Sequence, residues 1–167
     1  ALTGTLVRSV SKFRADSKID RTIMMVNDYA NKTYTTWNAI GDFSLVRTGR
    51  LIQTGIVDPS HINPTDANRM ISPYNSRFRV EAAAVACPSC GALFPSDSFI
   101  IQVYRVSPEQ CVPMVMNWVH HKQTAVYIGN ADAQNIHEVI PAKQNLSAAA
   151  ASCNAYGDTL GIAYVFD

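Results

Sequence analysis

Cys87 and Cys90 stand three positions apart in the stretch ACPSCGALF, the spacing with the clearest chemical meaning in the chain. A Cys-x-x-Cys pair can supply half of a zinc site, act as a redox dithiol or close a short covalent loop. Two more cysteines, Cys111 and Cys153, stand singly and far apart. An even set of four fits disulfides in an oxidising compartment. The count also fits a four-thiolate zinc site, which the single positions of Cys111 and Cys153 disfavour.

A redox role would require the Cys-x-x-Cys motif at the start of a helix, where the helix dipole lowers the pKa of a thiol. The residues before Cys87 have the pattern of a strand, and those after Cys90 indicate a turn. A zinc site would need two more ligands, and we expect the adjacent His120 and His121 to point in opposite directions. A loop closed by its own Cys87–Cys90 disulfide is therefore favoured, with a zinc or redox protein as the alternative.

No other local pattern predicts catalysis. His61 and His137 are isolated in expected loops, and the sequence contains no Gly-x-Ser-x-Gly, no phosphate-binding glycine loop and no His-Glu-x-x-His. We therefore expect no enzymatic activity, no cofactor and no bound metal.

Composition places the chain among single-domain globular proteins. Its 167 residues suffice for one domain, which we expect to span 1–167. Apolar residues make up 47% and charged residues 16% of the chain, which indicates extensive burial. A net charge of +1 gives no bulk electrostatic reason to expect a nucleic-acid partner. No apolar run approaches the roughly 18 residues that a membrane-spanning helix needs.

Residues 1–36 are expected to form one long helix. Apolar positions recur three or four residues apart, with one slip in the series: Leu2, Leu6, Val10, Phe13, Ile19, Ile23, Val26 and Ala30. The start lacks a clear capping residue, so we expect the helix to continue upstream of Ala1, in an apolar stretch of about 20 residues or more.

The segment 37–76 is expected to be a loop-rich connector, because it contains several prolines and asparagines. A short helix capped by Asp42 or Ser44 is expected to end near Gly55. One further helical turn is expected near Thr65–Met70.

Beyond residue 76 the apolar period changes to two, which predicts strands. Four are expected: 77–84, Ser98–Val106, Thr124–Ile128 and Thr159–Phe166. The last carries apolar residues on both faces, which implies that both faces are covered or that the strand lies in the middle of its sheet.

A short helix is expected between the second and third strands. It begins either at a capping box formed by Ser107 and Gln110, or at Val112 with Pro113 first. Its apolar face would hold Cys111, Met114, Val115 and Trp118.

The order and spacing of these elements resemble a type IVb pilin that lacks the apolar N-terminal half of its first helix. Three stretches carry the resemblance: SFIIQVYRVSPEQCVPMV, SCNAYGDTLGIAYVF and LIQTGIVDPS. It implies an α+β fold, with a long N-terminal helix packed against an antiparallel sheet, a loop-rich connector and a disulfide-bounded C-terminal region.

The resemblance also implies a Cys111–Cys153 disulfide that bounds residues 111–153. Closing a loop of roughly 40 residues would stabilise the fold by about 4 kcal/mol in the chain-entropy model. It would also hold the polar, alanine-rich segment 129–152, which is expected to be a loop with little burial. The Cys87–Cys90 insertion departs from the family's pattern, so the resemblance implies no role for it.

By this resemblance, the chain would be a structural subunit of an extracellular filament used in adhesion, aggregation or conjugative mating contact. Its partners would be copies of itself, the pilus assembly machinery and a cell-surface receptor bound by exposed loops near 58–76 and 129–152. The precursor would be held in the bacterial inner membrane by an upstream apolar helix, with its head in the periplasm. A minor pilin or secretion pseudopilin is the alternative. A DNA-receptor pilin would require a basic stripe, for which the candidates are Arg47, Arg50, Arg69, Arg77 and Arg79.

Overall fold

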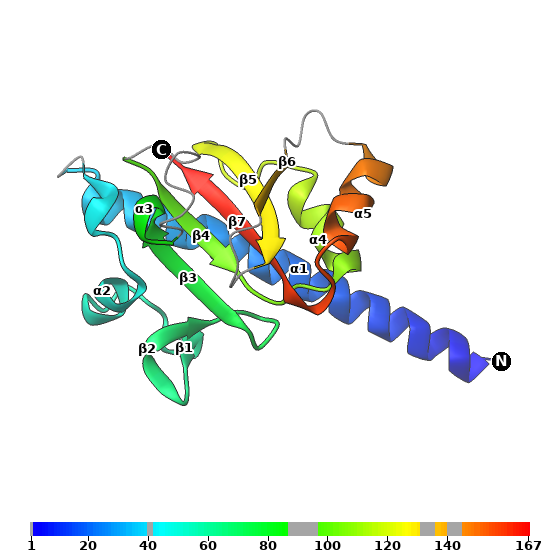
Figure 1. Ribbon diagram of the computed structural model, residues 1–167. Coiled ribbons are helices and arrows are strands. Elements are labelled where there is room, and N and C mark those ends of the chain that lie inside the picture. The colour runs from blue at the N-terminus through cyan, green and yellow to red at the C-terminus, as the bar shows by residue number, and fades with distance from the viewer. Residues whose placement is uncertain (1, 40–41, 87–96, 131–135, 140–144) are drawn as a thin grey trace.

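The protein is a two-layer structure in which one long helix lies against an antiparallel sheet (Figure 1). The computed structural model describes residues 2–39, 42–86, 97–130, 136–139 and 145–167. This arrangement confirms the α+β class expected from the sequence.

Helix α1 (Leu2–Trp37) runs behind the sheet, and its N-terminal part projects beyond the sheet's edge (Figure 1). Where α1 lies on the sheet, Val26, Tyr29 and Ala30 are fully buried, as the three- and four-residue apolar period predicts. Tyr34 continues this buried face, with its ring centroid 5.2 Å from that of Phe99 on the sheet.

The sheet contains seven strands among the described residues, in the order β1-β2-β3-β4-β7-β5-β6, and every neighbouring pair is antiparallel. The strands are β1 (Ile62–Asn63), β2 (Asp66–Ile71), β3 (Arg77–Ala82), β4 (Phe99–Val103), β5 (Gln123–Asn130), β6 (Ile136–Val139) and β7 (Leu160–Phe166).

Strand β7 lies between β4 and β5, and all seven of its residues are buried. Ile162, Tyr164 and Phe166 join the core beneath α1, whereas Ala163 and Val165 belong to a second buried cluster on the opposite face. Both faces of β7 are covered, as its sequence predicted.

The connector holds more regular structure than expected. Asp42 caps a short 3-10 helix, η1 (Phe43–Leu45), by accepting a hydrogen bond from Ser44 N–H, and a separate helix, α2 (Thr48–Gln53), follows. The predicted single helix is therefore divided in two. It ends before Gly55, whose φ of +78° favours glycine.

The helical turn expected near Thr65–Met70 is wrong, because Asp66–Ile71 form strand β2. The side chains of Asn63 and Asp66 accept hydrogen bonds from the backbone N–H groups of Thr65 and Asn68, two residues further on. Such Asx turns offer the backbone an alternative to a helix. Met70 then pairs with Phe78 of β3, which fixes the segment as a strand.

The segment 129–152 was expected to be a loop with little burial, and for its described residues the expectation of a loop is wrong. Strand β5 reaches Asn130, β6 pairs with it, and helix α5 (Leu146–Asn154) buries Ala149 completely. The remaining short helices of the described residues are η2 (Pro59–His61), α3 (Ala83–Ala86), α4 (Pro108–Val115) and η5 (Gly157–Thr159).

Candidate functional site

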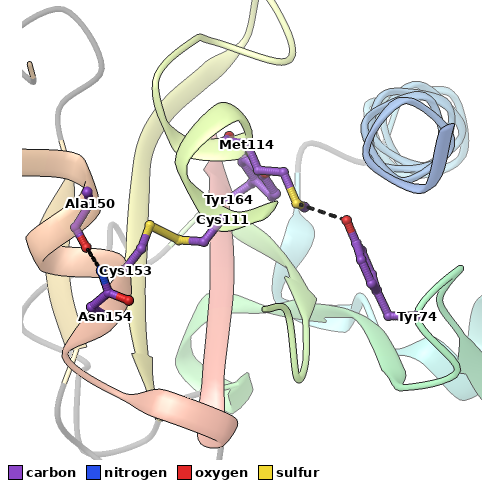
Figure 2. Close-up of a disulfide and its surroundings, with 7 residues drawn as sticks. All are labelled: Tyr74, Cys111, Met114, Ala150, Cys153, Asn154 and Tyr164. Atoms are coloured by element: carbon purple, nitrogen blue, oxygen red, sulfur yellow. Dashed lines mark hydrogen bonds between the residues drawn. A yellow bond between two sulfur atoms is a disulfide. The ribbon is translucent and has the colours of Figure 1, made fainter. Parts of the chain in front are cut away.

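A disulfide joins Cys111 of α4 (Pro108–Val115) to Cys153 of α5, with the two Cα atoms 5.9 Å apart (Figure 2). Both residues are fully buried. The bond closes a chain segment across a sequence separation of 42 residues, so it constrains the unfolded chain strongly. Residues 111–153 are called the disulfide-bounded region from here on.

Helix α4 begins at Pro108 with Ser107 in the capping position, although the Ser107 side chain makes no capping hydrogen bond. Of the two starts that the sequence allowed, the structure has the earlier one, and Pro113 lies inside the helix. Trp118 lies beyond the helix end and is 45% exposed, so its expected place on the buried face is wrong.

Met114 anchors α4 to the rest of the core. Its backbone carbonyl accepts a 3.0 Å hydrogen bond from the buried hydroxyl of Tyr164 on β7, and burial raises the pKa of that hydroxyl. Its sulfur lies 3.7 Å from the hydroxyl of Tyr74, whose pKa burial raises to about 12 (Figure 2). Because Cys111 and Met114 lie within one turn of α4, the disulfide is linked to the central strand β7 through Met114.

Helix α5 is held at both of its ends. The side chain of Asn145 caps the helix by accepting a 2.8 Å hydrogen bond from Ala148 N–H. Near the other end, the Asn154 amide donates to the Ala150 carbonyl at 2.9 Å. Leu146 in the first turn is 68% exposed. These two hydrogen bonds stabilise the ends of the helix, which exposes the Leu146 side chain to solvent.

On one side, α1 is attached to the connector through Tyr29, which is fully buried. The Tyr29 hydroxyl accepts a 3.1 Å hydrogen bond from Asp58 N–H and forms a second hydrogen bond, of 2.7 Å, with His61 Nδ1. Burial raises the pKa of Tyr29 to about 12. His61, expected to be a plain surface residue in a loop, therefore contacts the core through this hydroxyl.

On the other side, α1 is attached to the disulfide-bounded region through two asparagines one turn apart. Asn27 Nδ2 donates to the Val119 carbonyl at 2.8 Å, and Asn31 Oδ1 lies 2.8 Å from His120 Nε2. No local sequence signal predicted these contacts, because they join residues about 90 positions apart.

His120 and His121 were expected to point in opposite directions, as neighbours on a strand do, and this is wrong. They lie in the turn before β5, and their ring centroids are 4.4 Å apart in a stacked arrangement. Among the described residues, no group of three or more His, Cys, Asp or Glu side chains is placed to hold a metal ion. Cys87 and Cys90 lie outside those residues.

Three of the basic candidates lie close together, since burial lowers the pKa of Arg77 and the nearby charges of Arg79 and Arg69 lower it further. Arg69 pairs with Asp66 at 3.2 Å. Arg47 and Arg79 approach the same carboxylate, that of Glu81, at 4.0 and 3.7 Å. Two carboxylates thus face three of these arginines, so their positive charge is only partly balanced.

A groove of about 580 Å³ lies between α1, η2 and the turn that joins β2 to β3. It is lined by Arg21, Met24, Met25, Asp28, Ser60, His61, Ile71, Ser72, Pro73 and Asn75. The Met24 side chain is 70% exposed at this surface. In Figure 1, α4 and α5 lie on one side of α1, and the β1–β2 hairpin lies on the other.

Two solved structures share this arrangement. The type IV b pilin from Salmonella typhi is 15% identical, with a TM-score of 0.56 over 86% of this chain and 95% of the pilin. TcpA, a type IV pilin from Vibrio cholerae El Tor biotype, is 11% identical, with a TM-score of 0.59 over 90% of this chain and 99% of TcpA. The fold is that of a type IV pilin.

The pilin fold confirms the resemblance that the sequence suggested, even though no protein-family model and no curated protein matches the sequence. Within the pilin fold, the structure contains the Cys111–Cys153 disulfide in the C-terminal region. No helix among the described residues is both long enough and apolar enough to cross a membrane.

Proposed function

We propose that this chain is the head of a type IVb pilus subunit, which assembles with copies of itself into an extracellular filament. The observation that carries the proposal is the pilin fold together with the way α1 projects beyond the sheet (Figure 1). In this role α1 supplies the contacts between subunits, and the sheet and disulfide-bounded region form the outer surface. The role is structural rather than enzymatic.

The described surface supports an open assembly. Met24 at the groove and Leu146 of α5 are exposed apolar side chains in different parts of the head. A contact between unlike surfaces of identical subunits repeats without closing when its rotation does not close, and it then produces a helical filament. Burial of apolar area along α1 and between heads would supply the cohesion.

The buried disulfide supports assembly outside the reducing cytosol, because disulfides form and persist in oxidising compartments. We extend the proposal to a precursor held in the bacterial inner membrane by an upstream apolar helix, with the head in the periplasm until the assembly machinery incorporates it. The filament surface would then act in adhesion, aggregation or mating contact through a cell-surface receptor.

Assembly is tested by adding one charge to the projecting part of α1 in the full-length protein. Val10→Asp places a carboxylate in the apolar stripe of the sequence, whereas Ser11→Asp places the same charge on the opposite side of the helix. Filaments are sheared from cells, quantified, and examined by electron microscopy with gold-labelled antibodies against the head.

We expect Val10→Asp to abolish filaments and Ser11→Asp to retain them. Label along the whole filament identifies a major subunit, whereas label at one end identifies the alternative, a minor pilin. Filaments of wild-type abundance in the Val10→Asp strain, or filaments without label, would overturn the proposal.

A further inference from the structure

Residues 116–122, which join α4 to β5, are held against α1 by polar side chains. Asn27 Nδ2 donates to the Val119 carbonyl, and Val119 N–H donates to Gln123 Oε1 at 2.9 Å. His120 makes a further contact, with Asn31, and the Lys122 ammonium lies 4.5 Å from the ring centroid of Tyr34 on α1. Met116 and Val119 also pack against the core, so the polar contacts add to this packing, and one of them involves a titratable ring.

The hydrogen bonds around His120 fix its protonation state. Lys122 N–H donates to His120 Nδ1 at 3.1 Å, so Nδ1 must be unprotonated and the ring proton lies on Nε2. Nε2 then donates to Asn31 Oδ1. The orientation of the Asn31 amide agrees, because Asn31 Nδ2 donates to Asn27 Oδ1 at 3.2 Å. The whole chain of donors and acceptors is consistent only with a neutral His120.

The surroundings of His120 oppose a positive charge. The residue is 5% exposed, with the Tyr34 ring of α1 stacked at 5.9 Å and Phe166 of β7 at 5.6 Å. The charged or titratable neighbours that act on the ring are His121 and Lys122. Burial lowers the pKa of His120, and these two neighbours lower it further.

We propose that His120 is an acid-operated latch, which binds the turn 116–122 to α1 when neutral and releases it when Nδ1 takes up a proton. Protonation replaces the acceptor for Lys122 N–H with a second donor, so this hydrogen bond is lost. The new charge is buried beside two basic groups, and the ring therefore leaves its site for solvent. This property belongs to the head itself and does not depend on filament assembly.

The pH window follows from the direction of the shift. Above about pH 6.5, where a free histidine is neutral, the closed and released forms are both unprotonated and the latch holds fully. As the pH falls below this value, the released form binds a proton that the closed form cannot bind. The equilibrium then shifts towards release by about tenfold for each pH unit over which only the released form is protonated.

The test is an NMR measurement on the isolated head between pH 7.5 and 5. Hydrogen exchange gives the protection factor of the Lys122 amide, and the Trp118 indole signal reports the environment of the turn. His120→Gln removes the titration. His121→Gln, at the exposed neighbouring position, is the matched control.

In the wild type and in His121→Gln, we expect protection of Lys122 to fall with pH while the amides of β4 and β7 stay protected, and the Trp118 signal to shift over the same range. In His120→Gln neither change should follow pH. A pH-dependent step that persists in His120→Gln, or unchanged Lys122 protection in the wild type, overturns the latch.

The imidazole signals of the wild type give a second measurement, which does not depend on the folding of any variant. The latch requires neutral His120 to carry its proton on Nε2, and to titrate below the range of free histidine at the same pH as the loss of Lys122 protection. Titration of His120 at its ordinary pKa with the amide still protected would refute it.

Discussion

The two sides of α1 are attached to the rest of the head in different ways. On the connector side, the hydroxyl of the buried Tyr29 forms hydrogen bonds with Asp58 and His61, and the Tyr29 ring packs against Phe78. On the other side, Asn27, Asn31 and His120 form hydrogen bonds that hold the turn 116–122 against α1. This turn follows α4, which the disulfide joins to α5. The comparison indicates that packing secures the connector, whereas the disulfide-bounded region relies on a covalent bond and on polar contacts that respond to pH.

The largest expected effect comes from removing the covalent bond. The double substitution Cys111→Ser and Cys153→Ser should lower the free energy of unfolding by about 4 kcal/mol in the chain-entropy model. Urea denaturation of the head without reductant measures this loss. Cys87→Ser with Cys90→Ser is the matched control for loss of two thiols, and closing so short a loop predicts a smaller effect. A loss below about 1 kcal/mol for the first pair would contradict the role given to the disulfide.

The next effect separates packing from hydrogen bonding on the connector side. Tyr29→Phe keeps the ring against Phe78 but removes the hydroxyl that forms hydrogen bonds with Asp58 and His61. We expect a loss of about 2 kcal/mol, because two polar groups lose their partner. The same denaturation experiment measures it. A variant as stable as the wild type would mean that packing alone secures this side.

A smaller effect is expected on the opposite side. Asn27→Ala removes the hydrogen bond to the Val119 carbonyl and should cost about 1 kcal/mol. Thr35→Ala, at an exposed position on the same helix, should stay within about 0.5 kcal/mol of the wild type. Equal losses in the two variants would show that the contact with the turn contributes nothing specific.

The last effect is absent at neutral pH and is a displacement of alkaline unfolding. Burial raises the pKa of folded Tyr29 to about 12, from 10.0 in the unfolded chain. Between these values the unfolded state loses a proton that the folded state keeps, so stability falls as the pH rises through this range. Tyr29→Phe should therefore lose stability less steeply than the wild type above pH 10. Absorbance of tyrosinate and circular dichroism followed together measure this, and identical slopes would contradict it.

The sequence predicted the elements whose pattern is long and regular. The apolar period from Ile19 to Ala30 placed α1, and the two-sided apolar run of Thr159–Phe166 placed β7 inside the sheet. These predictions succeeded because burial of a whole face leaves a periodic signal in the residues themselves. The pilin resemblance was recognised from the order of such elements.

Short elements and long-range polar contacts could not be predicted in the same way. Strand β2 is fixed by Asx turns and by pairing of only two residues with β3, and its own sequence carries no clear alternation. The stacking of His120 on His121 depends on a turn whose shape is set by α1. The partners of Asn27 and Asn31 lie about 90 residues away, and a single sequence carries no signal for such pairs.

The position of β7 has a consequence for how the chain reaches its final form. It follows every other strand of the sheet in sequence, yet it separates β4 from β5 in space. Without Leu160–Phe166, β4 and β5 would each have an unpaired edge. Unpaired edges invite association with other chains. A head whose last strand has not yet paired is therefore most open to association with other chains, and a chaperone that covers these two edges would protect it at that moment.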